Sequence, residues 1–332
     1  MKKPLGFTVH DVARLAGVSA MTVSRALNHP ERVSPDTLAK VREVISQTGY
    51  VPNALAGGLR TAHARVVAAV LPTLTGPVFQ ETIRALNQAL ETNGYQLMIG
   101  QSGYDAPRED ALLDAIIRRR PDGIVLTGIV HSAEGRRQLI AAGIPVVETW
   151  DLTPSPIDML VGFSHERIGE SACHYLHGRG YRKLGLLSAN DTRALRRLEG
   201  FQRMAKNLGL APVRTCLLPA PTNLGNGRSG LSELLDAHPD LDAVFCSSDM
   251  LALGALIEAQ ARGIAVPRQL GVMGFGDLDF AASLQPPLTT VRIDGTRIGR
   301  TAAQFIVDRA EGREVEHAIV DIGFQIIERS SC

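Results

Sequence analysis

The sequence predicts a small all-α helix-turn-helix head followed by an α/β core of two parallel-sheet lobes. Apolar residues recur at helical spacing on both sides of Gly17, near the start of the chain. From about residue 65, short apolar runs alternate with helical periodicity, which is typical of a parallel sheet covered by helices. This alternation starts again after about Val161, and 332 residues suffice for a head and two lobes.

The first part of the chain predicts two short helices joined by a tight turn. Thr8 and Asp11 have the spacing of a helix N-cap and its first-turn acid. Gly17 ends this helix, because glycine adopts a left-handed backbone at little cost. Ser19 caps a second helix that runs through Leu27. The inner face of the first helix consists of Val9, Val12, Ala13 and Ala16. Two such helices form a helix-turn-helix, whose second helix enters the major groove of DNA.

A third helix is expected between Ser34, which caps it, and Gly49, which ends it. Pro35 suits the first helical position. The apolar stripe of this helix consists of Leu38, Val41, Val44 and Ile45. We expect the three helices to share one small core, built from Val12, Leu15, Val23, Leu27 and Leu38.

Charge is distributed unevenly along the chain. The net charge is only +1, but residues 1–60 hold eight Lys or Arg against four Asp or Glu, a charge of +4 that leaves −3 for the rest. A basic head on a mildly acidic body fits local contact with DNA. No apolar run follows Lys2 and Lys3, and no stretch is long enough to span a membrane, so we expect a cytoplasmic protein. The four cysteines lack metal-ligand spacing, so we expect reduced thiols, no metal and no cofactor.

The core is predicted as two successive sets of strands and helices. The first set has strands at 66–71, 96–99, 123–126 and 146–147 and helices at 79–90, 109–117 and 133–141. The second set has strands at 183–187, 213–218, 243–246 and 271–274 and helices at 165–177, 195–208, 230–237, 251–262 and 295–310. The segment 319–328 is expected to return and pair as a strand. Ligands in such folds bind beyond the carboxyl ends of the strands, so we expect a cleft between the lobes.

The motifs of the head resemble the lactose-repressor (LacI) family of bacterial transcription regulators, and the resemblance continues through the rest of the chain. The matching residues are Asp11-Val12-Ala13, Ala16-Gly17-Val18-Ser19, Thr22-Val23-Ser24-Arg25, Asn28, Val33-Ser34 and Gly49-Tyr50-Val51-Pro52-Asn53. The resemblance implies a DNA-binding regulator, expected to be a repressor. It also implies a core like a periplasmic sugar-binding protein, with a small-molecule effector between its lobes. The expected domains are a DNA-binding head at 1–52, a hinge and linker at 53–64, and an effector-binding and dimerisation core at 65–332.

Within the second helix, base readout is expected from its first residues and from Arg25. Ala20 and Met21 can contact thymine methyl groups, and Arg25 can pair with O6 and N7 of guanine. The polar residues suited to phosphate contact are Ser19, Thr22, Ser24 and Asn28. Thr8 is also expected at the DNA. The alternative is that the serines and threonines only cap helices.

The resemblance also implies a hinge helix in each subunit of a homodimer bound to a pseudo-palindromic operator. Asn53 and Ala56 would contact DNA in the minor groove, and Leu59 takes the position of the family's leucine wedge. The sequence departs from the family pattern at Gly57 and Gly58, which cost about 2 kcal/mol of helix propensity together. The alternative for 54–58 is a flexible linker.

The effector pocket is expected to combine cations, hydroxyl groups and an aromatic surface. The candidate residues are Thr73, Thr75, Phe79, Trp150, Arg193, Arg197, Ser248 and Asp277. Arg197 matches the family's signature of Arg, two residues, Gly and an aromatic residue. Guanidinium groups bind carboxylates bidentately and acids accept sugar hydroxyls, so this set suits a polyhydroxylated anion. For Arg193 and Arg196 the alternative is a solvated helix face.

Several segments are similar to one branch of the family, the LacI-type gluconate operon repressors, whose effectors are sugar acids. These segments are 20–25, 28–34, 71–75, 94–98, 103–104, 161–163 and Gly274-Phe275. The resemblance therefore implies a sugar acid such as gluconate or a ketogluconate. A neutral sugar, a nucleobase and a protein corepressor stay open, as does a sugar-binding protein without a regulatory role. We expect no enzyme, because the sequence lacks a nucleophile elbow, a phosphate loop and paired carboxylates at catalytic spacing.

Overall fold

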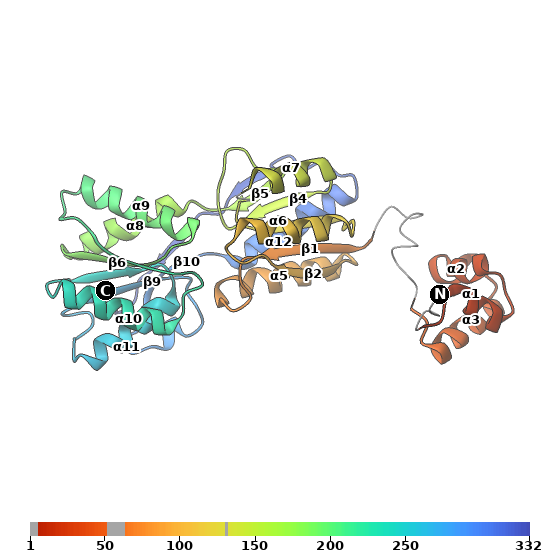
Figure 1. Cartoon of the computed structure of the whole chain (residues 1–332), viewed down its shortest axis with the longest axis horizontal. Helices are drawn as coiled ribbons and strands as arrows, with labels where there is room; N and C mark the ends of the chain where they lie inside the picture. The colour runs from red at the N-terminus through yellow and green to blue at the C-terminus, as the bar shows by residue number, and fades with distance from the viewer. Residues whose placement is uncertain (1–5, 52–63, 130–131) are drawn as a thin grey trace. The chain divides into compact units, whose positions relative to one another are not determined.

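The computed structural model describes residues 6–51, 64–129 and 132–332. It divides into two compact units, Met1–Ala64 and Arg65–Cys332, which we describe separately as head and core (Figure 1). The expected hinge residues Asn53, Ala56 and Leu59 lie outside the described residues.

The head consists of short helices whose ends follow the sequence signals. Its helices are α1 (Val9–Ala16), α2 (Ala20–Asn28), the 3₁₀ turn η1 (Pro30–Arg32) and α3 (Pro35–Thr48). Thr8 and Asp11 form a complete capping box at α1, and Ser19 accepts a hydrogen bond from the amide of Thr22 at the start of α2. Gly17 and Gly49 end α1 and α3 with φ of +66° and +63°, where a side chain would be strained.

The core of the head differs in its members from the one that the sequence predicted. Its buried residues are Val12, Ala13, Val23, Ala26 and Val41. The placement of Leu15 and Leu27 in this core was wrong, because their exposed fractions are 53% and 36%. The four small apolar residues of α1 already form its inner stripe, and Leu15 falls outside it. In the last turn of α2, Ala26 takes the inward position instead of Leu27.

The first lobe of the core, lobe 1, is built on a parallel sheet with the strand order β11-β5-β4-β3-β1-β2. Its strands are β1 (Val66–Leu71), β2 (Gln96–Gln101), β3 (Gly123–Thr127), β4 (Val146–Thr149), β5 (Met159–Gly162) and β11 (Ile319–Asp321). Its helices are η2 (Pro77–Phe79), α5 (Gln80–Thr92), α6 (Ala106–Ile117), α7 (Ala133–Ala142) and α12 (Gly295–Ala310). Val67 and Ala69 pack with the α5 and α12 side, and Ala68 and Val70 pack with α6 and α7.

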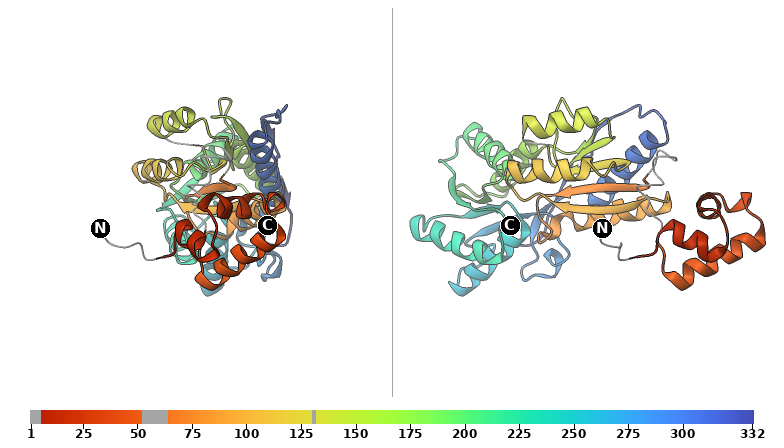
Figure 2. Two further views of the ribbon diagram at one scale, coloured as in Figure 1. Left: turned by 90° about the vertical axis from the view of Figure 1, so that its right-hand side faces the viewer. Right: turned by 45° about the vertical axis from the view of Figure 1, so that its right-hand side comes forward.

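The second lobe, lobe 2, repeats this architecture with the strand order β12-β10-β9-β8-β6-β7. Its strands are β6 (Leu184–Ala189), β7 (Arg214–Leu218), β8 (Ala243–Cys246), β9 (Gly271–Phe275), β10 (Thr289–Arg292) and β12 (Gln325–Ile327). Its helices are α8 (His165–Gly178), α9 (Thr192–Asn207), α10 (Leu224–Ala237), α11 (Asp249–Ala261) and the turn η3 (Ala281–Ser283). Helices cover both faces of the sheets in Figure 2. The predicted fold class, a helical head and a two-lobed α/β core, is confirmed.

The sequence predicted that the chain completes one lobe before it enters the other. The structure shows instead that the chain passes back and forth between the lobes. Within the described residues the chain crosses between lobes three times: from β5 to α8, from β10 to α12 and from β11 to β12. The prediction that grouped α12 with the second set was wrong, because α12 packs against α5 of lobe 1. This contact is close: a Cβ on Gly299 would lie 2.3 Å from the carbonyl oxygen of Thr82. The segment 319–328 splits into one strand for each sheet, and β12 is antiparallel to β10.

Two short strands, β5 and β10, were missed, and each has only four residues. The four cysteines are unpaired and buried. None of the helices in the described part of the chain combines the length and the apolar character needed to cross a bilayer.

Candidate functional site

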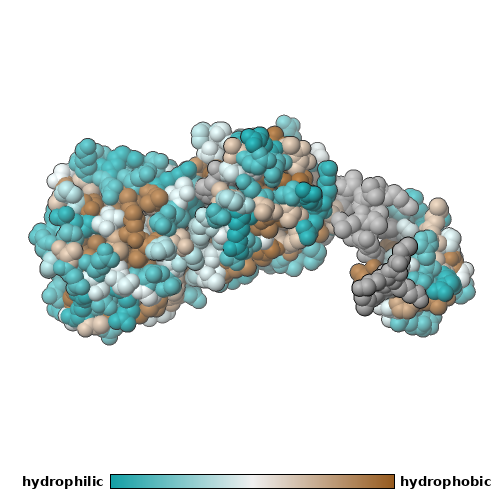
Figure 3. Space-filling view, in the orientation of Figure 1, coloured by the Kyte–Doolittle hydropathy of each residue, from teal (hydrophilic) through white to brown (hydrophobic). Residues whose placement is uncertain are grey.

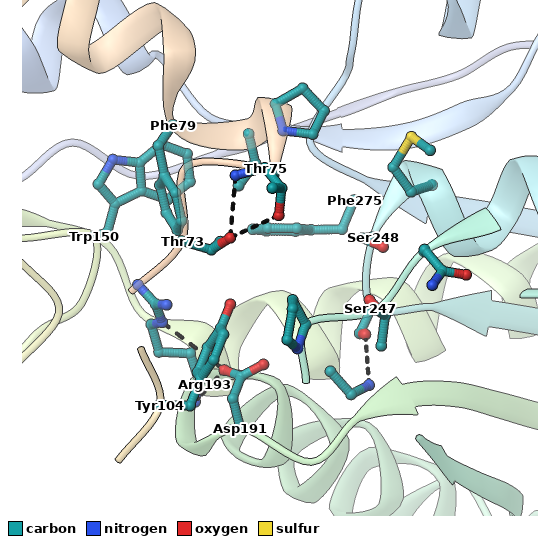
Figure 4. A pocket seen from close by; sticks show the side chains of 18 of the residues that line it. Thr73, Thr75, Phe79, Tyr104, Trp150, Asp191, Arg193, Ser247, Ser248 and Phe275 are labelled. Atoms are coloured by element: carbon teal, nitrogen blue, oxygen red, sulfur yellow. Dashed lines mark hydrogen bonds and ion pairs between the residues drawn. The ribbon is translucent and has the colours of Figure 1, made fainter. Parts of the chain in front are cut away.

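A cavity of about 290 Å³ lies where the carboxyl ends of the strands of both lobes meet. Lobe 1 contributes the segments after β1, β2 and β4, and lobe 2 contributes the segments after β6, β7, β8 and β9 together with α8 and α9. This is the position at which open parallel sheets bind ligands. Figure 4 shows Thr73, Thr75, Phe79 and Trp150 on one side, Asp191, Arg193 and Ser247 on the other, and the ring of Phe275 between them.

Seven of the eight residues predicted for the pocket line this cavity: Thr73, Thr75, Phe79, Trp150, Arg193, Arg197 and Ser248. The structure does not place Asp277 there. Its carboxylate accepts a hydrogen bond from Nη2 of Arg329 at 2.7 Å and lies 3.9 Å from Arg292. These two arginines hold Asp277 away from the cavity, and the carboxylate that lines it belongs to Asp191.

Aromatic rings form one wall of the cavity. The centroids of Phe79 and Trp150 lie 5.0 Å apart at an interplanar angle of 87°, and Trp150 lies 5.6 Å from Phe163 in the same edge-to-face manner. Trp150 has a left-handed backbone with φ of +63°, which is strained for a bulky residue. Its Nε1 donates a hydrogen bond to Oγ1 of Thr82 on α5 at 3.1 Å, which fixes the indole in the wall.

Hydroxyl groups line the cavity at the segment after β1 and at the start of α11. Oγ1 of Thr73 and Oγ1 of Thr75 are 2.9 Å apart, and Thr73 also accepts from the amide of Thr75. Ser248 caps α11 by accepting from the amide of Leu251 at 3.3 Å. A hydroxyl oxygen that accepts one such bond keeps a donor and a further lone pair for a ligand.

Arg197 is the most deeply buried cation of the cavity, with 6% of its surface exposed. Its Nη1 donates to Nδ1 of His165 at 2.8 Å, and its Nη2 donates to the carbonyl oxygen of Ser247 at 3.1 Å. The guanidinium also lies over the ring of Phe275, 4.1 Å from its centroid. Burial lowers the pKa of Arg197 to about 10, so the group stays charged at neutral pH. Among the described residues, Nε of Arg197 has no hydrogen-bond partner.

Arg193 supplies a second cation to the same cavity. Its Nε lies 3.9 Å from the carboxylate of Asp191, and its guanidinium lies 5.3 Å from the centroid of Phe79. The charged residues that line the cavity are therefore two arginines and one aspartate. Arg197 has no ion pair of its own among the described residues, although the carboxylate of Asp191 favours its charged form from a longer distance.

His165 connects this arrangement to lobe 1. It is the first residue of α8, and its Nε2 lies 2.9 Å from the carbonyl oxygen of Trp150. Burial, and then the charges of Arg197 and Arg193, hold the pKa of His165 well below its usual value. The imidazole is therefore neutral at physiological pH.

Comparison with known proteins identifies the chain as a regulator. Residues 8–53 match the family described as bacterial regulatory proteins, lacI family, and residues 173–332 match the periplasmic binding protein-like domain. The HTH-type transcriptional regulator GntR of Pseudomonas aeruginosa is 37% identical over 98% of this chain and 95% of its own length. The chain belongs to the lacI family of bacterial regulatory proteins.

Solved structures of lacI-family relatives agree with this assignment. A regulator of the family from Silicibacter pomeroyi superposes with a TM-score of 0.92 at 34% identity, over 98% of this chain and 99% of that one. The transcription regulator GntR from Chromobacterium violaceum superposes with a TM-score of 0.77 at 38% identity, over 80% of this chain and 98% of that one. The chain is thus a DNA-binding transcriptional regulator of the lacI family, and its relatives are regulators and not enzymes.

In this lacI-family head, two of the three predicted base-reading residues, Met21 and Arg25, lie on one exposed face of α2, and the third, Ala20, packs partly against the head core. Met21 is 64% exposed, and Arg25 follows one turn later on α2 and is exposed as well. Ala20, Thr22 and Ser24 are half-buried along the same helix, which ends at Asn28. Thr8 and Ser19 do cap helices, so capping and phosphate contact are compatible roles for both. Contact of these residues with DNA stays a prediction.

Several residues of the lacI-family cavity escaped the sequence analysis. They are Tyr104, His165, Asp191, Asn223, Ser247 and Phe275. Tyr104 and Asp191 directly follow the turns after β2 and β6, and Phe275 ends β9, so the rule that ligands bind at strand ends would have found them. His165 is the first residue of α8, where the chain passes from lobe 1 to lobe 2. No pattern in the sequence indicated that it lines the cavity. Arg196, whose alternative was a solvated face, makes an ion pair with Asp151.

Proposed function

We propose that this regulator is a repressor whose affinity for a pseudo-palindromic operator is controlled by a sugar acid bound in the cavity between the lobes. Gluconate and ketogluconates represent the chemical class. We further propose that the protein acts as a homodimer in the cytoplasm, where it meets operator DNA. Effector binding alters the angle between the lobes and so changes operator affinity in either direction.

The observation that carries the effector proposal is that the buried Arg197 forms no direct ion pair among the described residues, while Asp191 and Asp151 favour its charged form only at longer range. A buried cation is costly unless an anion pairs with it. In the described structure the partners of Arg197 are a neutral imidazole, a carbonyl oxygen and an aromatic face. A carboxylate in the cavity would pair with this guanidinium through charge-assisted hydrogen bonds, which are the strongest hydrogen bonds in proteins.

The rest of the cavity suits the polyhydroxylated part of such a ligand. The hydroxyl groups of Thr73, Thr75 and Ser248 and the carboxylate of Asp191 can bind sugar hydroxyls. The rings of Phe275 and Trp150 offer apolar surface to the carbon chain. A volume of about 290 Å³ lies at the small end of ligand pockets, which suits a single sugar acid.

A groove of about 390 Å³ on lobe 1 supports the homodimer. It is lined by Leu74, Ile83, Leu97 and Ile99, next to the edge strand β2. Leu74 and Ile99 are 56% and 43% exposed, which is high for large apolar residues. Figure 3 shows hydrophobic residues at the surface of both lobes, between hydrophilic ones. We propose that a second copy of the chain covers this groove, because one recognition helix alone reads too few bases.

The test of the effector uses Trp150, the single tryptophan of the chain and part of the cavity wall. Tryptophan fluorescence is titrated with gluconate, 2-ketogluconate and glucose. We expect an acid to bind at least tenfold more tightly than glucose, because only the acid neutralises Arg197. Equal affinity for glucose would contradict the sugar-acid assignment and favour a neutral sugar. A response to a nucleobase alone would favour stacking on the aromatic wall.

A further inference from the structure

We infer that His165 is a positioning residue that holds Arg197 for the effector and connects it to lobe 1. This inference rests on the proposed function, in which Arg197 binds the anionic group of the ligand. His165 makes two hydrogen bonds in opposite directions, one to a residue of lobe 2 and one to a residue of lobe 1.

The packing of α8 on α9 fixes the distance between His165 and Arg197. Gly169 on α8 and Gly200 on α9 let the two helices meet at backbone contact. A Cβ on Gly169 would lie 1.9 Å from the carbonyl oxygen of Arg197, and a Cβ on Gly200 would lie 2.2 Å from that of Glu166. His165 and Arg197 therefore stand on two helices that cannot slide apart without losing this contact.

The hydrogen bonds select one form of the imidazole. A guanidinium nitrogen of Arg197 can only donate, so Nδ1 of His165 must accept. The carbonyl oxygen of Trp150 can only accept, so Nε2 must carry the proton. The neutral tautomer with hydrogen on Nε2 satisfies both bonds, and a protonated imidazole would lose the bond to Arg197. The rings of Phe163 and Phe275 pack against the imidazole at centroid distances of 4.9 and 6.4 Å.

The link continues from His165 into lobe 1. Trp150 belongs to the cavity wall, and its indole donates to Thr82 of α5. Thr82 lies at the contact of α5 with α12, where a Cβ on Gly295 would be 3.0 Å from its Oγ1. A ligand that shifts the guanidinium of Arg197 therefore acts on lobe 1 through a continuous series of buried contacts.

Two substitutions separate the two bonds of His165. In His165→Asn, the amide oxygen lies near the position of Nδ1 and can accept from Arg197, but the side chain is too short to reach Trp150. In His165→Gln, the amide reaches the position of Nε2 and can donate to Trp150, while Arg197 loses its acceptor. His174→Asn and His174→Gln are matched controls, because His174 lies on the exposed face of the same helix.

The full-length variants are titrated with gluconate by Trp150 fluorescence, and their operator affinity is measured with and without gluconate. We expect the Asn variant to bind gluconate at least fivefold more tightly than the Gln variant, because it alone keeps the acceptor for Arg197. We expect the Asn variant to lose at least half of the operator response of the parent. Equal gluconate affinities in the two variants, or a full operator response in the Asn variant, would overturn the inference.

A ligand-free measurement separates this inference from the proposed function. If no sugar acid changes the fluorescence of the parent, the proposed effector class fails. The emission of Trp150 without ligand then tests the positioning role alone. We expect it to shift in the Asn variant, which loses the bond to the Trp150 carbonyl, and to stay near that of the parent in the Gln variant. Identical emission in both variants would rule the role out.

Discussion

Arg196 of lobe 2 and Asp151 of lobe 1 form an ion pair across the boundary between the lobes. Nη1 of Arg196 lies 2.8 Å from each oxygen of the Asp151 carboxylate. The aspartate side chain is only 5% exposed and the arginine side chain 37%. Neither residue lines the cavity. His165 thus joins the lobes beside the cavity, and Arg196 joins them outside it.

Replacing Arg196 with Gln is expected to destabilise the core by about 1–3 kcal/mol, because a buried carboxylate loses its cation. Urea unfolding at pH 7 measures this loss. Arg203→Gln is the matched control: Arg203 lies on the same helix, but its partners Glu166 and Glu170 belong to the same lobe and all three side chains are substantially exposed. An equal loss of unfolding free energy in the control would show that the ion pair between the lobes stabilises the core no more than an exposed ion pair within one lobe.

Arg25→Ala is expected to weaken operator binding by about 1–3 kcal/mol and to relax base preference at one position per half-site. Fluorescence anisotropy with specific and non-specific duplexes separates the two effects. Arg42→Ala, an exposed arginine on α3, serves as a comparison. A parallel fall in specific and non-specific affinity would make Arg25 a phosphate contact.

Ile99→Lys is expected to convert the proposed dimer to a monomer at micromolar concentration, because it puts a charge into the apolar groove on lobe 1. Analytical ultracentrifugation gives the mass in solution. Ile140→Lys on α7 is the control, since Ile140 is exposed to a similar degree and lies outside the groove. A dimeric Ile99 variant would place the interface elsewhere.

Asp249 is expected to make the protein less stable at neutral than at acid pH. Burial raises the pKa of its carboxyl from 3.8 to about 6, although Thr290 donates to it at 2.6 Å. The folded state therefore binds this proton more tightly than the unfolded state, and the stability it adds is lost as the pH rises from about 4 to 6. The size is about 3 kcal/mol.

Asp249→Asn removes this titration. Between pH 4 and pH 7 the stability of the Asn variant should therefore rise relative to the parent, as measured by urea unfolding at several pH values. Asp236→Asn should change little over this range, because hydrogen bonds from Arg262 hold the pKa of Asp236 below its ordinary value of 3.8, so its contribution changes mainly below pH 4. A constant difference between Asp249→Asn and the parent would refute the assigned pKa.

Local signals predicted the elements of the fold well, because caps, glycines and apolar periodicity act within a few residues. Thr8 begins α1, and Gly17 and Gly49 end α1 and α3, as the sequence predicted. The sequence assigned α12 to the wrong lobe. Its place depends on the close packing of Gly299 against α5, a helix that lies far away in the sequence. Leu15 was misplaced since its neighbours, and not its own hydrophobicity, decide which face of α1 is buried.

The cavity could be predicted in part for the same reason. Arg197 and Trp150 stand at strand ends or in a sequence motif, and the structure brings them to the cavity. Asp277 also follows a strand, but its two arginine partners come from residues 292 and 329, which no local pattern connects to it. The link through His165 could not be predicted, because it depends on how the two lobes are placed relative to each other. The predicted hinge contacts of Asn53, Ala56 and Leu59 stay predictions.

The most direct test of the account is the operator affinity of the parent and of Arg197→Gln, each with and without saturating gluconate. Anisotropy with an operator selected in vitro gives the four dissociation constants. We expect gluconate to change the affinity of the parent by about tenfold, within the usual range of allosteric coupling, and to leave that of Arg197→Gln within about twofold. An equal response of the variant, or an equal response of the parent to glucose, would contradict control by a sugar acid bound at Arg197.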